Sequence, residues 1–388
     1  MLYNYIKPEN LSEELNSLVN DTRGGIPTAV FGVAFSEKCH IASCMGYPVI
    51  YVAKDELTAK AVARELRALS GKKAVYLPAK DDVLLFNKAF NKDSLYARIY
   101  ALHQLSIGAD FLVATFESLL QLIPKKIESF DLVVEQEYPF DYLIKKLLDF
   151  GFTRVEEIEK KGEFTIRGDI LHIFPINADA PIRLDFFGDE LESLRYFDQL
   201  GGKLEGKLKS FTILPTVDFT IDECEIPIIK NQLKSELTAF GVNLFASKAR
   251  DIINEINEKL EVNRRHPCLS FISPLLDCMR GSIKDYMGQE AVVVYDEGKL
   301  LSDSLLGTLK EHSERCLQLK RNCECFSFTV NQLKTDKAIL KELNFSRKLS
   351  LQSLTTAIPF FNPLKTYRIK CSPIARYSLH PEDFFEDV

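Results

Sequence analysis

The sequence lacks the apolar runs, the leader and the positive charge that several classes of protein require. No stretch approaches the ~18–20 consecutive apolar residues of a membrane-spanning helix, so we expect no membrane partner. Residues 1–10 hold no basic segment followed by an apolar run, so we expect no secretory signal. The 49 Lys and Arg against 55 Asp and Glu give a net charge of −6. That balance is not typical of a nucleic-acid binder, because contact with phosphates requires clustered positive charge.

The cysteines follow no pattern of a disulfide framework or a zinc site. They are odd in number, nine, and lie scattered between Cys39 and Cys371, while Cys323 and Cys325 are too close together for the usual ligand spacing. This predicts reduced thiols and a cytoplasmic location. We also find no Ser/His/Asp arrangement and no metal-ligand cluster. The sequence therefore predicts no catalytic residue and no metal ligand.

The first third of the chain alternates short apolar runs with amphipathic stretches, in a chain long enough for two or three domains. The runs are rich in β-branched and aromatic residues, which predicts buried parallel strands. We expect them at Thr28–Val33, Pro48–Ala53, Ala74–Pro78 and Phe111–Thr115. Helical spacing of apolar residues predicts helices at Asp55–Ser70, with Asp55 as N-cap, and at Asp93–Leu105. This alternation predicts an α/β layer.

A different pattern follows, in which short strands are separated by Gly and Pro at tight turns. After a short helix at Pro139–Phe150, the predicted strands are Arg154–Glu159, Gly162–Ile166, Ile170–Phe174, Ile182–Phe186 and Leu191–Tyr196. Gly201–Lys209 is predicted to be a turn or hairpin, and Ser210–Leu214 a further strand. The pattern indicates a small antiparallel α+β domain.

The α/β pattern then returns. The predicted helices are Ile228–Phe240, Ala246–Glu261, Leu300–Leu319 and Thr335–Leu343, and the predicted strands are Ala291–Tyr295, Phe326–Val330 and Leu349–Leu351. The simplest architecture is one α/β domain with a parallel sheet, split in sequence by the inserted antiparallel domain. We place its first part at residues 1–125, the insert at 126–209, and the return with a helical and strand extension at 210–388.

The loop after the first strand resembles a phosphate-binding loop with two substitutions. Residues 32–39 read GVAFSEKC, against the pattern G-x-x-x-x-G-K-[ST]. Gly32 and Lys38 match the pattern. Glu37 replaces the second glycine and brings a negative charge to a site for anions, and Cys39 replaces the hydroxyl that would hold Mg²⁺, a cation that prefers oxygen. On this stretch alone, a working nucleotide site, a chance match and a relic of a nucleotide-binding fold all stay open.

A second segment favours the relic. Residues 292–297 read VVVYDE, the form of a Walker B strand that ends in two acids. In active motors such an Asp contacts Mg²⁺ and such a Glu orients the attacking water. Asp296 and Glu297 hold these positions here, although a solvated strand end that carries acids is the ordinary alternative.

Two further segments are much more specific. Gly151–Pro175 contains GEFTIRGD followed by FP, and Ile182–Asp198 reads IRLDFFGDELESLRYFD. In order and spacing they resemble the second domain that the excision-repair protein UvrB shares with the transcription-repair coupling factor. Phe211–Phe219 also falls where this family places it. The resemblance covers most of residues 1–300 and implies a degenerate P-loop NTPase or helicase-like α/β domain with an inserted domain.

Within the family, the departures resemble the coupling factor. UvrB has an intact phosphate loop and a long aromatic hairpin that enters DNA, whereas Ala79–Lys92 is too short for that hairpin and the loop here is altered. The resemblance implies an amino-terminal UvrB-like module that has lost ATP hydrolysis and needs no cofactor. It also implies a fragment, whose full-length relatives bind RNA polymerase and DNA and use ATP and Mg²⁺ through domains further on.

In this family the inserted domain binds the damage-recognition protein UvrA through charged side chains on one sheet face. The resemblance assigns that role to Arg154, Thr165, Arg167, Arg183 and Asp185, with Thr165 at a position that is basic in UvrB. Arg suits such a face, because its planar fork pairs with carboxylates and it is favoured at binding hot spots. A solvated surface with scattered ion pairs is the open alternative, and His172 on the same strands is expected to be a packing or surface residue.

Charge favours a protein partner for the insert, since residues 141–200 hold 8 Lys/Arg and 13 Asp/Glu, a net charge of −5. The expected function is an adaptor in transcription-coupled nucleotide excision repair, which recruits UvrA to stalled RNA polymerase without hydrolysing ATP. The alternative is a divergent UvrB-type helicase subunit that still binds ATP through Lys38 and Asp296 and binds damaged DNA.

Overall fold

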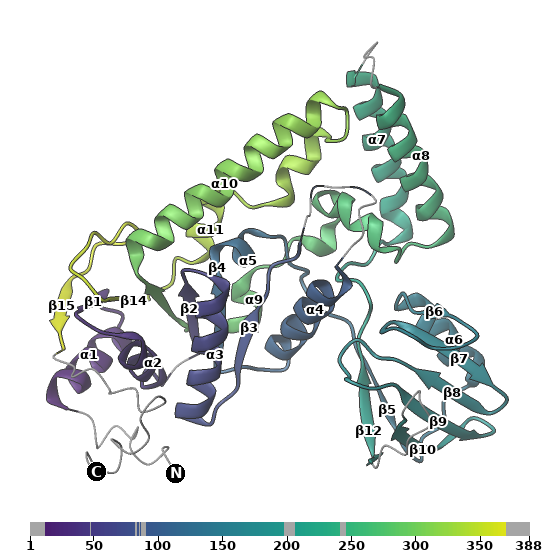
Figure 1. The fold of residues 1–388 in the computed structure, drawn as a ribbon, viewed down its shortest axis with the longest axis horizontal. Coiled ribbons are helices and arrows are strands. Elements are labelled where there is room, and N and C mark those ends of the chain that lie inside the picture. Colours follow the sequence, from purple (N-terminus) through teal and green to yellow (C-terminus); the bar gives the residue numbers. More distant parts are fainter. Residues whose placement is uncertain are drawn as a thin grey trace, which may run out of the picture.

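The centre of the molecule is a seven-stranded parallel sheet, seen in a computed structural model that describes residues 12–46, 48–81, 84, 86, 91–197, 206–240 and 246–369. Its order is β15-β1-β14-β13-β2-β4-β3, and all neighbouring strands are parallel. The strands are β1 (Thr28–Phe31), β2 (Val49–Ala53), β3 (Ala74–Leu77), β4 (Phe111–Thr115), β13 (Val292–Asp296), β14 (Arg347–Gln352) and β15 (Lys365–Arg368). Strands from the two ends of the chain therefore interleave in one sheet, which confirms the split α/β domain (Figure 1).

Helices cover both faces of this sheet. On one face lie α1 (Glu13–Arg23), α2 (Phe35–Ser43) and α3 (Glu56–Ser70). On the other face lie α4 (Lys92–Ser106), α5 (Phe116–Leu120), α9 (Ile283–Met287), α10 (Gly298–Arg321) and α11 (Asp336–Glu342). Alternate residues of each strand enter the two cores, as Tyr51 and Val52 of β2 do. The predicted cap is confirmed, since Asp55 accepts a hydrogen bond of 2.7 Å from the Thr58 amide.

The inserted domain is a six-stranded sheet in the order β11-β10-β9-β8-β7-β6. Its strands are β6 (Thr153–Arg154), β7 (Glu163–Arg167), β8 (Ile170–Ile173), β9 (Ile182–Phe187), β10 (Glu190–Tyr196) and β11 (Lys207–Leu208). One face packs on α6 (Phe140–Asp149), whose Leu143 and Leu147 enter the domain's core. All pairs are antiparallel except β6 with β7, and the prediction of a strand over Arg154–Glu159 is wrong beyond its first residue.

A separate two-stranded sheet closes the insert where the chain enters and leaves it. There β5 (Phe130–Val133) pairs antiparallel with β12 (Ser210–Ile213), and Leu132 and Ile213 join the core of the insert. Gly151 follows α6 and has a φ of +83°, a backbone conformation that glycine adopts readily. A Cβ there would lie 2.3 Å from the Thr216 hydroxyl oxygen, so the absence of a side chain lets the two segments approach closely.

A helical unit stands beside the sheet body and the insert. It consists of η3 (Glu223–Glu225), α7 (Ile226–Phe240), α8 (Ala246–Val262), η4 (Pro267–Leu275), η5 (Asp277–Met279) and η6 (Ser327–Gln332). Helices α7 and α8 pack against each other and project from the body (Figure 1). The prediction of a strand over Phe326–Val330 is wrong. Phe326 and Phe328 stack at 5.6 Å and both pack on Phe271, but the backbone over Ser327–Gln332 forms a 3-10 helix.

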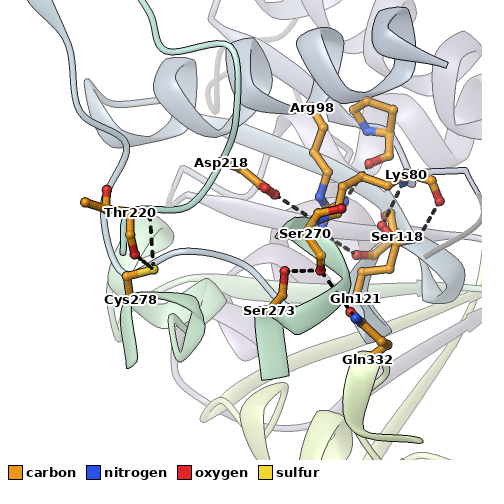
Figure 2. A network of polar contacts seen from close by, with 11 residues as sticks. Lys80, Arg98, Ser118, Gln121, Asp218, Thr220, Ser270, Ser273, Cys278 and Gln332 are labelled. Atoms are coloured by element: carbon orange, nitrogen blue, oxygen red, sulfur yellow. Dashed lines mark hydrogen bonds and ion pairs between the residues drawn. The ribbon is translucent and has the colours of Figure 1, made fainter. Parts of the chain in front are cut away.

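A buried polar network joins the sheet body to the segment that follows the insert (Figure 2). Lys80, after β3, pairs at 2.8 Å with Asp218, and their side chains are 7% and 0% exposed. Gln121 bonds both the amide and the carbonyl of Lys80, at 2.7 and 2.8 Å. Arg98 of α4 is fully buried and donates to the carbonyls of Pro78 and Ser118 at 2.6 and 3.1 Å. The network fixes the segment around Asp218 against the strand ends of the body.

No helix in the described ranges is long and apolar enough to cross a membrane. Half of the short segment Ala79–Lys92, and the first part of the predicted turn Gly201–Lys209, lie outside the described residues. The domain boundaries that we place at 125 and 209 stay predictions.

Candidate nucleotide loop and charged sheet face

The altered phosphate loop and the two acids meet at one edge of the parallel sheet. Strands β1 and β13 are separated only by β14, and all three are parallel, so their carboxyl ends lie side by side. The loop after β1 leads into α2, while β13 ends at Asp296 and leads into α10. This geometry brings residues 258 positions apart in the chain into direct contact. The carboxyl edge of such a sheet is where ligands bind in open α/β folds.

Lys38 is held by both acids. Its ammonium lies 2.7 Å from the nearer oxygen of Asp296 and 2.5 Å from that of Glu297. The Lys38 and Asp296 residues are only 5% and 3% exposed, so the three charges interact largely away from water. Glu297 also accepts a hydrogen bond of 2.8 Å from the Ser353 amide. We call Lys38, Asp296 and Glu297 the lysine cluster.

The two acids of the lysine cluster differ in their environment. Burial raises the pKa of Asp296 above its usual range, despite the opposing charge of Lys38. Burial also opposes ionisation of Glu297, but its hydrogen bonds with Lys38 and Ser353 outweigh this and lower its pKa. Glu297 has a φ of +60°, a left-handed conformation that costs a non-glycine residue about 1–2 kcal/mol. The contacts of its side chain hold it there.

The remaining loop residues are placed unfavourably for phosphate and magnesium. Gly32 has a φ of +81° and makes the turn out of β1, as the motif requires. Glu37 lies in the first turn of α2, with one carboxylate oxygen buried and without a hydrogen-bond partner in the described part of the chain. Cys39 is 0% exposed in the apolar core, and burial raises the pKa of its thiol, which disfavours the thiolate that binds metals.

The second candidate site is the face of the inserted sheet that points away from α6. Strand register places these side chains in two rows, because residues paired across strands share a face. One row is Thr165, His172, Arg183, Arg195 and Lys207. The other is Arg167, Ile170, Asp185 and Ser193. We call these nine positions the outer face. The alternate residues, among them Phe164 and Leu184, form the core of the domain.

Asp185 is the centre of a polar network on the outer face. One oxygen accepts a hydrogen bond of 2.8 Å from Arg183, and the other accepts bonds from Ser193 at 2.6 Å and Arg195 at 3.0 Å. Burial opposes its ionisation, but Ser193 and the two arginines outweigh that effect and lower its pKa. The network holds the side chains of Arg183 and Arg195 on the outer face, which keeps a net positive charge.

Four of the five predicted partner-binding residues meet on the outer face. Thr165 is buried there, and its hydroxyl donates to the Glu156 carbonyl at 3.1 Å, so it stabilises the adjoining loop. Arg167 is exposed, and none of the described residues forms an ion pair with it. Arg154 is exposed on the edge strand β6, in register with Phe164 of the core. The structure therefore does not place Arg154 in either row.

His172 lies in the middle of the outer face. From the sequence we expect it to be a packing or surface residue, without a binding role. It pairs in register with Thr165 on one side and Arg183 on the other. Its ring stacks on Phe197 with centroids 4.4 Å apart. Alternation on β8 places His172 on this face, but only the register across three strands shows that it is surrounded by arginines.

The comparison with protein families decides what the insert is. The family model described as the UvrB interaction domain matches residues 130–219. This segment is similar to the UvrB interaction domain. The matched range includes both the outer face and the β5–β12 pair that closes the insert. The matched residues do not include the sheet body or the helical unit.

The wider chain is similar to two kinds of protein. It is 27% identical over 317 residues to a transcription-repair-coupling factor of Myxococcus xanthus, covering 77% of this chain and 26% of that protein. A transcription-repair-coupling factor of Helicobacter pylori is 28% identical over 294 residues, 65% of this chain and 28% of that protein. The UvrABC system protein B of Microcystis aeruginosa is 28% identical over 211 residues, 50% of this chain and 32% of that protein.

The chain thus spans about a quarter to a third of the length of these relatives. The match to a coupling factor extends over the sheet body as well as the interaction domain. The resemblance to a UvrB-like module of transcription-repair coupling factors, which we predict from the sequence, is confirmed.

Proposed function

We propose that this chain is an adaptor module of transcription-coupled nucleotide excision repair, which binds UvrA through the outer face of its interaction domain and does not hydrolyse ATP. The observation that carries the proposal is the outer face itself, a set of arginines organised around Asp185 inside a segment that matches the UvrB interaction domain. RNA polymerase, DNA and the ATP- and Mg²⁺-driven motor belong in this proposal to other parts of a full-length coupling factor.

The charge of the outer face supports a protein partner with carboxylates. Arg183 and Arg195 are fixed by Asp185, so they lose little side-chain freedom when a partner docks. Arg167 is exposed and keeps its full pairing capacity for a carboxylate. Around this face the segment 141–200 is acidic, with a net charge of −5, which opposes a long track for a nucleic-acid backbone.

A binding titration with UvrA tests this assignment. Arg167→Ala is the cleanest variant, because it breaks no ion pair among the described residues. Truncating one partner of a buried charged pair at an interface costs about 2–5 kcal/mol, so the Kd should rise at least tenfold. Lys145→Ala is the matched control, since Lys145 is an exposed cation on α6, which covers the opposite face of the sheet. An Arg167→Ala protein that binds as tightly as the Lys145→Ala protein contradicts the assignment.

Arg154→Ala adds a second comparison within the same titration. The family resemblance gives Arg154 a contact, whereas strand register puts it off the outer face. We expect a smaller rise in Kd than for Arg167→Ala. Duplex DNA in place of UvrA should give no binding at physiological salt. Strong DNA affinity that falls steeply with salt would instead favour the alternative of a DNA-binding helicase subunit.

The lysine cluster supports the absence of ATP hydrolysis. Lys38, the residue that would contact phosphates, is tied to two carboxylates, and its ammonium takes the position on Asp296 where a motor would hold Mg²⁺. Glu37 adds a negative charge at the start of α2, where phosphate would sit. A nucleotide would have to break the buried ion pairs and approach three carboxylates.

Calorimetry with Mg-ATP tests this part of the proposal separately. We expect no binding heat at micromolar to tens of micromolar nucleotide, and no phosphate release. Micromolar affinity or measurable hydrolysis would overturn it and favour the helicase-subunit alternative, whatever the result with UvrA.

A further inference from the structure

His172 lies among the arginines of the outer face. It lies on β8, and three arginines face it, Arg167 from β7, Arg183 from β9 and Arg195 from β10. Asp185 of β9 is the acid nearest in the same network, but Arg183, Arg195 and Ser193 already occupy both of its oxygens. The ring nitrogen Nε2 of His172 is buried and has no hydrogen-bond partner within the described chain.

A small cavity opens beside this histidine. It has a volume of about 140 Å³ and is lined by Glu157, Ile158, Thr165, Arg167, His172 and Phe197. One water occupies ~30 Å³ of liquid, so the cavity has room for the four or five heavy atoms of one carboxylate side chain. Ile158 and the Phe197 ring form apolar walls, and Arg167 supplies a cation that no ion pair in the described chain occupies.

The free protein holds His172 neutral. Burial, together with Arg183 and Arg167, lowers its pKa to about 4, against a smaller opposing effect of Asp185. The ring is therefore uncharged at physiological pH. Besides burial, the causes that lower this pKa are the positive charges of Arg183, Arg167 and Arg195, which a docking carboxylate would offset.

We propose that a carboxylate side chain of the docking partner enters this cavity, pairs with Arg167, and makes His172 take up a proton on binding. The inference rests on the proposed function and identifies the chemistry of the contact. A carboxylate within about 4–6 Å shifts a histidine pKa upward, typically by 1–3 units, because it stabilises the imidazolium. It also cancels part of the repulsion from Arg167 and Arg183.

The sign of the proton exchange discriminates between kinds of partner group. Covering the face with apolar or cationic groups keeps the imidazole neutral, since added burial and positive charge both lower its pKa. Only an approaching anion produces proton uptake. Glu157 is the one carboxylate that already lines the cavity, so Glu157→Gln should tighten binding by removing a like charge.

The experiment measures UvrA binding by calorimetry at pH 6 and pH 8, in buffers of different ionisation enthalpy. If the pKa of His172 in the complex returns to its ordinary ~6.5, about three-quarters of a proton is taken up per complex at pH 6. The Kd then falls about fourfold from pH 8 to pH 6 through this group alone. His172→Gln should lose that proton uptake and the fourfold dependence of the Kd on pH.

Two further measurements accompany the calorimetry: the affinity of the Arg167→Ala protein, and the NMR titration of the His172 ring. Arg167→Ala should weaken binding at both pH values, because it removes the partner of the carboxylate. In NMR, the ring signal that disappears in His172→Gln should titrate near pH 4 in the free protein and at higher pH in the complex.

UvrA binding with no proton uptake, or with equal uptake by the His172→Gln protein, overturns this inference and leaves the proposed function standing. No UvrA binding at either pH overturns both.

Discussion

At the scale of single residues, Lys38 is the cation that holds two acids together at the carboxyl edge of the parallel sheet. Its ammonium pairs with the carboxylates of two consecutive residues, Asp296 and Glu297, which would otherwise repel each other. Removing one partner of a buried ion pair usually costs about 3–5 kcal/mol, because an uncompensated charge stays behind. The cluster is therefore expected to stabilise the fold at the carboxyl edge of the parallel sheet.

Replacing Lys38 by Met tests this role. The loss in free energy of unfolding should be about 3 kcal/mol at pH 8 and smaller at pH 5. The smaller loss at pH 5 follows from Asp296, whose pKa is already raised by burial and rises further without Lys38. An acid with a raised folded-state pKa stabilises the protonated, low-pH protein, and that stabilisation is lost as the pH rises through the folded pKa.

Urea unfolding at the two pH values measures the effect. Lys60→Met is the matched control, since Lys60 pairs with Glu56 at the surface, where both side chains are more than half exposed, and should cost at most about 1 kcal/mol. A Lys38→Met loss that equals that of the control, or that is the same at pH 5 and pH 8, would show that the cluster carries no buried charge coupling.

At the scale of elements, the Asp218 network decides how the interaction domain is attached. Asp218 lies in the segment that leaves the domain after β12, and Lys80 and Arg98 come from the sheet body (Figure 2). Asp218→Asn leaves Lys80 and Arg98 buried with less compensation, so it should lower the free energy of unfolding by about 3–5 kcal/mol. Asp277→Asn makes the same chemical change in an exposed pair with Lys125 and should cost far less, because water screens that pair.

The shift in urea midpoint of the two variants measures this difference. Equal shifts would mean that the network contributes no more than a surface ion pair. A large shift for Asp218→Asn alone supports a rigid attachment of the outer face to the sheet body.

The elements also show what the sequence determines locally and what it does not. Strands with apolar runs, such as β2, β4 and β13, were predictable because strands buried on both faces consist almost entirely of apolar residues. β15 was not, because Lys365–Arg368 is a mostly exposed edge strand, which pairs with β1 alone among the described strands. β5 likewise depends on its partner β12, far along the chain. Aromatic alternation at Phe326–Val330 mimics a strand, although the rings pack from a 3-10 turn.

Contacts between distant segments also limited what could be predicted of the lysine cluster and the outer face. The motif positions of Lys38, Asp296 and Glu297 were visible, but their direct contact depends on strand order across 258 residues. Arg167, Arg183 and Asp185 were predicted to share a face from alternation, and register confirms that geometry. Arg154 was predicted with them from family resemblance, and its register with buried Phe164 separates it. A lone histidine in an alternating strand carries no signal of the three arginines that surround it.

At the scale of the whole molecule, charge is distributed unevenly. The net charge of −6 arises largely from residues 141–200, whose charge is −5, yet the outer face of that same domain collects Arg167, Arg183 and Arg195. An acidic domain with one basic face presents a localised target and repels anions elsewhere, which favours specific pairing over a long polyanion track. This arrangement is the physical basis of the proposed UvrA contact.

The most direct test of that claim is the affinity of the whole chain for UvrA when the outer face loses its charge. We predict that Arg167→Ala combined with Arg195→Ala raises the Kd at least a hundredfold, because Arg183 alone remains to pair with both Asp185 and the partner. Lys145→Ala should leave the Kd within about twofold. Unchanged affinity in the double variant, with its fold intact by circular dichroism, would contradict the account.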